Sequence, residues 1–165
     1  MKKSELETRL LALEKNRPVR EAGLQVRAAE ATIGGERVPV EYRWHQAGSS
    51  GPIVLLIHGT PSSLVAWTEV IHGGPGHEGL AKSCRVFALD VLGHGTTRTE
   101  LGPYSFQKCA DWISGFLKLL DLRDVTIVGQ SYGGEFAWRA ALDSAERVSR
   151  VVLMSSSGFP RRDDE

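Results

Sequence analysis

The residues around Ser131 have the types and spacing of a nucleophilic serine. The hexapeptide GQSYGG at 129–134 follows an apolar run at 125–128 and precedes a helical pattern at 133–142. A serine on such a strand-to-helix turn holds a strained backbone and exposes its hydroxyl over the end of a sheet. Gly129 and Gly133 leave room for the crowded backbone. A bare G-x-S-x-G also occurs by chance in glycine-rich turns, but the strand and helix context favours a catalytic Ser131.

Two more short motifs follow apolar runs that are typical of buried strands. HGTP at 58–61 follows the run at 53–57, and DVLGHG at 90–95 follows the run at 85–89. The ordered set of strand–HG, strand–D-x-x-GHG and strand–GQSYGG resembles the α/β-hydrolase superfamily. It is similar to the subgroup of esterases, proline iminopeptidases, C–C bond hydrolases, haloalkane dehalogenases and epoxide hydrolases. The three motifs, within residues 24–158, are specific to the fold and much less specific to a substrate.

The resemblance implies where an oxyanion would be stabilised. Loop 58–61 takes the place of the oxyanion loop after the third strand of that fold. The two expected donors are the backbone N–H groups of Tyr132 and Thr60, because Pro61 has no N–H. Losing one such donor typically costs about 2.7–4 kcal/mol of transition-state stabilisation.

The other motif residues are expected to shape loops. His58 is disfavoured as the general base, because the triad order of the fold places the histidine after the serine. The resemblance likewise makes the aspartate and the GHG loop mainly structural. This structural set comprises His58, Gly59, Asp90, Gly93, His94 and Gly95, together with Gly129 and Gly133. The last two lie in the expected turn around Ser131, which we call the elbow.

A serine, in place of an aspartate, as the nucleophile at the elbow restricts the reactions that this fold could carry out. Haloalkane dehalogenases and epoxide hydrolases resemble this chain in fold but place an aspartate there, which forms an alkyl-enzyme ester. Ser131 suits attack on an ester, thioester, amide or activated ketone of a small molecule, followed by hydrolysis of the acyl-enzyme. Tyr132, beside the nucleophile, is the aromatic residue most expected to touch substrate, whereas Trp67, Phe136 and Trp138 are more typical of core.

The rest of a catalytic triad is missing from the sequence. A serine hydroxyl needs a general base, and the base needs an orienting acid. All five histidines precede Ser131. Of the later acids, Glu135, Asp143 and Glu146 are expected to be solvated, and the others lie in a polar tail. We therefore expect a chain that lacks its cap and last strands and is inactive alone.

The HGGPG sequence at 72–76 has the spelling of the oxyanion loop of proline iminopeptidases. It follows a predicted helix at 64–71 and not a strand, and residues 58–59 already occupy the strand position. We interpret 72–79 as a glycine-rich connection, with a pocket-shaping role as the alternative.

The elements that must position these motifs follow from hydrophobic periodicity. Strand-like runs at 24–33 and 37–45, joined by Gly34-Gly35, predict a hairpin. Strands at 53–57, 85–89, 125–128 and 148–154 then alternate with helices at 64–71, 106–122 and 133–142. This alternation predicts an α/β fold with a mainly parallel sheet flanked by helices. We divide the chain into a helical leader at 1–22, with its amphipathic helix at 1–16, and a partial α/β-hydrolase domain at 23–165.

Composition excludes several other classes of protein. Twenty basic residues balance twenty acidic ones, which argues against a nucleic-acid binder. Two cysteines are too few for a disulfide framework, so we expect free thiols. The longest apolar run is too short to span a bilayer, no targeting segment is recognisable, and we expect a cytoplasmic protein that makes no membrane contact. No metal-ligand spacing or dinucleotide fingerprint is present, so no metal or cofactor is expected.

The sequence leaves three functions open. A serine hydrolase is favoured, because a remnant has no reason to keep the elbow and the HG loop together. A non-catalytic remnant used for binding or assembly is the alternative from another class, and a cofactor-free haloperoxidase or a lyase on the same fold is the third. The last predicted strand, 148–154, would be an uncovered edge, so we expect self-association or pairing with a missing C-terminal half.

Overall fold

The computed structural model describes residues 21–95, 97 and 104–158. The amphipathic helix expected at 1–16 and the polar tail at 161–165 lie outside the described residues. Within the described part, strands and helices alternate after an N-terminal hairpin, as the sequence predicts.

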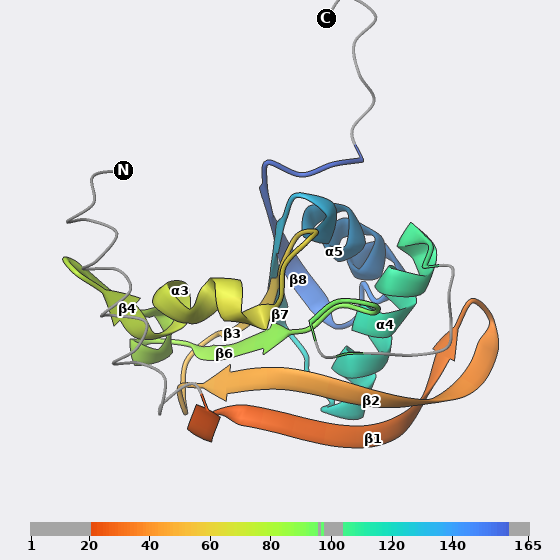
Figure 1. Cartoon of the computed structure of the whole chain (residues 1–165), viewed down its shortest axis with the longest axis horizontal. Coiled ribbons are helices and arrows are strands. Elements are labelled where there is room, and N and C mark those ends of the chain that lie inside the picture. Colours follow the sequence, from red (N-terminus) through yellow and green to blue (C-terminus); the bar gives the residue numbers. More distant parts are fainter. Residues whose placement is uncertain (1–20, 96, 98–103, 159–165) are drawn as a thin grey trace, which may run out of the picture.

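A six-stranded sheet with the order β1-β2-β6-β3-β7-β8 forms the centre of the molecule (Figure 1). The first two strands pair antiparallel, and β2 pairs antiparallel with β6, whereas the pairs β3–β6, β3–β7 and β7–β8 are parallel. The expected α/β fold with a mainly parallel sheet is therefore confirmed. The strands are β1 (Leu24–Ile33), β2 (Glu36–Ala47), β3 (Ile53–Ile57), β6 (Arg85–Leu89), β7 (Val125–Gln130) and β8 (Val148–Met154).

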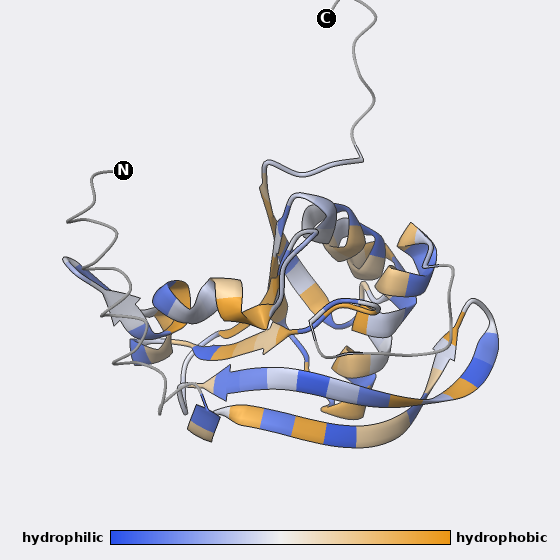
Figure 2. Ribbon diagram, in the orientation of Figure 1, coloured by the Kyte–Doolittle hydropathy of each residue, from blue (hydrophilic) through white to orange (hydrophobic). Residues whose placement is uncertain are grey.

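Two glycines make the turn of the hairpin formed by β1 and β2. Gly34 and Gly35 have φ values of 62° and 85°, the left-handed conformation that a two-residue hairpin turn requires. Figure 2 shows hydrophilic and hydrophobic residues alternating along both strands, as expected of strands with one buried face. The β2 strand runs beyond the predicted range 37–45 and reaches β6 with its last four residues.

The central strands are buried on both faces because helices cover both. On β3, Leu55 and Ile57 join one hydrophobic cluster and Val54 and Leu56 join another. The first cluster includes residues of α4 (Phe106–Leu119) and α5 (Tyr132–Asp143). The second includes residues of the 3-10 helix η1 (Leu64–Trp67) and of α3 (Thr68–His72). Alternating side chains of one apolar strand thus meet different helix layers.

The α4 helix packs against the β1–β2 hairpin. Its residues Ala110, Ile113 and Leu117, which recur at helical spacing, are buried, while Phe106 at its start remains 38% exposed. The rings of Tyr42 and Trp112 lie 4.2 Å apart, and the Tyr42 hydroxyl donates to the Trp112 carbonyl at 3.1 Å.

The region 72–79 is a connection, in agreement with its interpretation from sequence. Two short strands, β4 (Gly73–Gly74) and β5 (His77–Glu78), form a small antiparallel pair between α3 and the 3-10 helix η2 (Leu80–Lys82). The Nε2 atom of His72 lies 2.9 Å from that of His45 on β2, so this histidine contacts the hairpin.

Strand β8 is the edge of the sheet, and its side chains are largely exposed. Val151, Val152 and Met154 are 36%, 45% and 45% exposed. No helix among the described residues is long and apolar enough to cross a membrane.

Candidate active site

Ser131 occupies the turn between β7 and α5. Its φ and ψ are 54° and −125°, a conformation that a residue with a side chain rarely adopts. Three backbone hydrogen bonds hold it there: its N–H donates to Met154 at 3.0 Å, and its carbonyl accepts from Gly134 at 3.0 Å and from Ser157 at 3.2 Å. The strain is therefore supported from the helix and from the segment that follows β8.

The loop that follows β3 packs closely against the elbow, which explains why positions 59 and 133 are glycine. A β-carbon at Gly59 would lie 2.9 Å from the Ser131 β-carbon, and one at Gly133 would lie 2.4 Å from the His58 carbonyl oxygen. Real β-carbons do not come so close to backbone, so any larger residue would push the two loops apart. The structure thus brings together the HG loop and the serine turn, which are more than 70 residues apart in the sequence.

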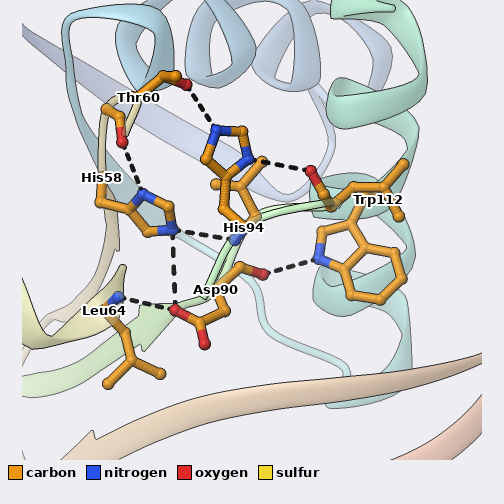
Figure 3. Close-up of polar contacts among 9 residues, drawn as sticks. His58, Thr60, Leu64, Asp90, His94 and Trp112 are labelled. Carbon is orange, nitrogen blue, oxygen red and sulfur yellow. Dashed lines mark hydrogen bonds and ion pairs between the residues drawn. The ribbon is translucent and has the colours of Figure 1, made fainter. Parts of the chain in front are cut away.

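The side chain of His58 is buried and held by hydrogen bonds from both sides of its ring. Its side chain is 1% exposed; the Val91 N–H donates to its Nε2 at 3.1 Å, so its Nδ1–H donates to the Gly59 carbonyl at 2.9 Å (Figure 3). Burial lowers the pKa of this imidazole below its usual value, against smaller raising contributions from the Gly59 hydrogen bond and Asp90. With both ring nitrogens engaged and the ring neutral, His58 is not poised to take a proton from Ser131.

Asp90 ties the loop after β6 to both helix layers. Its carboxylate accepts the Leu64 N–H at 2.8 Å, and its carbonyl accepts the Trp112 indole N–H at 3.1 Å (Figure 3). A β-carbon at Gly95 would lie 2.3 Å from this carboxylate, so the GHG loop folds directly over it. These contacts support the structural role that the family resemblance implies.

The Thr60 side chain is tied to the GHG loop. His94 donates Nδ1–H to the Leu92 carbonyl at 3.1 Å, and its Nε2 is hydrogen-bonded to the Thr60 hydroxyl at 2.6 Å (Figure 3). This bond fixes Thr60 beside Gly59, which packs on Ser131. The N–H of Tyr132 belongs to the first residue of α5, where helix N–H groups have no intrahelical acceptor. Both N–H groups remain predicted oxyanion donors.

A family model described as alpha/beta hydrolase fold matches residues 52–165. This chain belongs to the α/β-hydrolase fold family.

Individual relatives agree with that membership. The chain is 36% identical over 148 residues to an uncharacterised protein of Mycobacterium tuberculosis, covering 88% of this chain and 39% of that protein. It is 37% identical to the 2-hydroxymuconate semialdehyde hydrolase of a Pseudomonas species, covering 70% and 41%. The solved meta-cleavage product hydrolase of Pseudomonas fluorescens superposes with a TM-score of 0.63 at 34% identity, covering 82% and 47%. The chain spans less than half the length of each of these relatives.

One acidic residue of this α/β-hydrolase domain lies where sequence reasoning did not place it. Glu135 was expected to be solvated, but it is 6% exposed. Its Oε1 accepts two hydrogen bonds from Arg139, at 3.2 and 2.9 Å, and its Oε2 accepts the Ser157 hydroxyl at 3.1 Å. The expectation was wrong because the segment after β8 folds back over this part of α5. The i,i+4 spacing of a glutamate and an arginine was the available signal.

Aromatic side chains cluster around Tyr132, the residue after Ser131. Tyr132 is 43% exposed, and its ring lies 5.5 Å from that of Phe106, which lies 5.7 Å from that of Phe136. Trp67 and Phe136 are buried, as expected of core residues.

A surface hollow lies beside the loop that follows β3. It has a volume of about 650 Å³ and lies between the loop at 61–69 and the GHG loop. Ser131 does not line this hollow, so the candidate active site rests on the geometry of the elbow alone. Within residues 21–95, 97 and 104–158, no three histidine, cysteine or acidic side chains cluster as metal ligands would.

Proposed function

We propose that this chain provides the nucleophile and oxyanion hole of a serine hydrolase that acts on a small molecule with an ester, thioester, amide or activated ketone group. The observation that carries the proposal is the strained Ser131 at the strand-to-helix turn, against which Gly59 of the HG loop packs. Attack by the Ser131 hydroxyl on the substrate carbonyl, with its proton passing to the general base, forms a tetrahedral intermediate. Its collapse breaks the bond to the alcohol, thiol, amine or carbon leaving group, which takes up the proton, and water then hydrolyses the acyl-enzyme.

The surrounding backbone suits the charge that develops in this reaction. Two N–H groups, of Tyr132 and Thr60, would stabilise the oxyanion, and the N-terminal end of α5 adds the positive end of a helix dipole. Ser131 precedes the first residue of that helix.

The general base and its orienting acid belong, in this proposal, to residues outside this sequence. No histidine follows Ser131, and the ring nitrogens of His58 and His94 are engaged in the contacts described above. The 165-residue chain alone is accordingly proposed to be inactive. Cytoplasmic location and the lack of nucleic-acid or membrane partners remain part of the proposal. The balanced charge supports only the lack of a nucleic-acid partner.

A second candidate function, non-catalytic binding or assembly, is favoured by one observation. Strand β8 lies at the edge of the sheet and exposes Val151, Val152 and Met154. Such an edge pairs readily with another chain, either a second copy or a segment that completes the sheet. Intact elbow and HG-loop packing supports the catalytic candidate over this one.

Fluorophosphonate labelling distinguishes the two candidates. The complete translation product of the gene and the 165-residue chain are each treated with the probe, beside Ser131→Ala and, as a matched control, the exposed loop variant Ser49→Ala. We expect labelling of the complete product that is lost only in Ser131→Ala, and no labelling of the 165-residue chain. An unlabelled complete product would overturn the hydrolase proposal and favour assembly.

A further inference from the structure

A buried carboxylate lies directly behind the nucleophile turn and has no part in the proposed reaction so far. Glu135 is the fourth residue of α5, and its side chain is 7% exposed. Arg139 donates both of its hydrogen bonds to Oε1, which leaves Oε2 to accept the Ser157 hydroxyl. The Arg139 guanidinium is itself held 4.6 Å above the Trp138 ring. The ion pair is therefore fixed in one arrangement.

The partner of this carboxylate is also bonded to the nucleophile turn. The hydroxyl of Ser157 donates to Glu135, and its backbone N–H donates to the Ser131 carbonyl at 3.2 Å. The neighbouring residues pack closely on the same side: a β-carbon at Gly158 would lie 3.0 Å from Oε2 of Glu135, and one at Gly134 would lie 2.4 Å from the Ser156 hydroxyl oxygen. Glu135 thus holds the segment at 155–158 against the elbow.

The Ser131 carbonyl matters because of the peptide group to which it belongs. A peptide unit is planar, so the C=O of Ser131 and the N–H of Tyr132 turn together. A hydrogen bond accepted by that carbonyl fixes the direction of the N–H and polarises it, because hydrogen bonds in a chain strengthen one another. This N–H is one of the two donors assigned to the oxyanion.

We propose that Glu135 is a positioning residue of the hydrolase: through Ser157 it orients the peptide group between Ser131 and Tyr132, and so aims the Tyr132 N–H at the developing oxyanion. The inference rests on the proposed function. It concerns an interaction that matters in the transition state, so losing Glu135 should lower kcat while KM stays the same.

The test measures hydrolysis of p-nitrophenyl acetate and p-nitrophenyl butyrate by the complete translation product. Glu135→Gln keeps the side-chain shape but removes the charge, and Ser157→Ala removes only the hydroxyl. We expect each to lower kcat by about 10- to 100-fold, less than the full loss of an oxyanion donor, with unchanged KM. The double variant should be no worse than the more impaired single variant, because both break one connection. The matched control is Glu146→Gln, an exposed glutamate just beyond α5.

Rates are expressed per folded enzyme, from circular dichroism and size-exclusion chromatography, so that a purely structural role is separated from positioning. If Glu135→Gln only reduces the yield of folded protein and leaves kcat unchanged, the inference is overturned; additive losses in the double variant would overturn it as well.

Failure of the proposed function gives a different result. In that case the unsubstituted protein itself neither hydrolyses the esters nor reacts with fluorophosphonate. The connection is then read by hydrogen exchange, and Glu135→Gln should accelerate exchange of the Ser157 amide while Glu146→Gln leaves it unchanged. Equal exchange in both variants would overturn the inference without reference to activity.

Discussion

The neutral, buried imidazole of His58 should make the free energy of unfolding depend on pH. Because burial lowers its pKa in the folded state, the unfolded chain binds more protons than the folded chain as the pH falls below about 6.5. The free energy of unfolding should therefore decrease on going from about pH 7 to about pH 5, until the pH passes below the folded-state pKa.

Urea unfolding of the complete product and of His58→Gln, at about pH 7 and about pH 5, checks this. The variant should show a smaller pH-dependent loss of stability, even if it is less stable at both pH values. His77→Gln is the control, because that imidazole is exposed on β5. Equal losses in His58→Gln and the unsubstituted protein would contradict the prediction.

Individual residues were predictable from sequence where a short motif fixes their place. Ser131 and Gly59 belong to motifs that directly follow buried strands, and the structure packs them together. Glu135 belongs to no such motif: its i,i+4 spacing with Arg139 indicates an ion pair, but its contact with Ser157, 22 positions away, is not visible in the sequence. Likewise, the Gly34 N–H donates to the Asp111 carboxylate across 77 positions. Contacts of this kind follow from the tertiary fold, which single-residue patterns do not encode.

At the level of the single element, the first turn of α4 should depend on a side-chain cap for its stability. Ser105 has an extended backbone, and its hydroxyl accepts the Lys108 N–H at 3.1 Å, so it caps the helix. Ser105→Ala should lower the free energy of unfolding by about 1 kcal/mol, because one N–H in the first turn loses its acceptor. Ser105→Asp, which can cap equally well, should keep the original stability. Chemical denaturation of the three proteins tests this, and equal stability of all three would contradict the assigned cap.

The end of the same helix shows why an element boundary was misplaced. Apolar periodicity predicted a helix at 106–122, but α4 ends at Leu119. Asp121 adopts a φ of 46°, the Leu122 N–H bonds to the Leu117 carbonyl, and the Asp121 N–H bonds to the Lys118 carbonyl. This is the Schellman arrangement, usually marked by glycine. An aspartate tolerates the same conformation, so the sequence contains no glycine that would have indicated the end of the helix. Strand positions were easier, because continuous apolar runs define them.

At the scale of the whole molecule, the two edges of the sheet differ in a way that predicts association. The β1 edge belongs to a hairpin whose strand carries Arg27 and Glu30 among its exposed positions. That β1 edge also exposes Leu24 and Val26, near the start of the strand. The β8 edge carries one exposed charge, Arg150, followed by the exposed apolar side chains of Val151, Val152 and Met154, on a strand paired only with β7 among the described strands. Unpaired backbone groups beside apolar side chains favour pairing with another chain, and native proteins commonly block such edges with charge. We therefore expect the 165-residue chain to self-associate through β8.

Placing a lysine on each edge in turn tests which one is responsible. Val152 on β8 and Val26 on β1 are 45% and 49% exposed, so Val152→Lys and Val26→Lys add the same charge at comparable exposure. Sedimentation velocity should show oligomers for the unsubstituted chain and for Val26→Lys, and a shift towards monomer for Val152→Lys, because a lysine at an edge opposes pairing. Circular dichroism confirms that both variants remain folded. A monomeric unsubstituted chain would remove the reason to assign assembly to β8, whereas equal oligomers in all three proteins would place the contact on another surface.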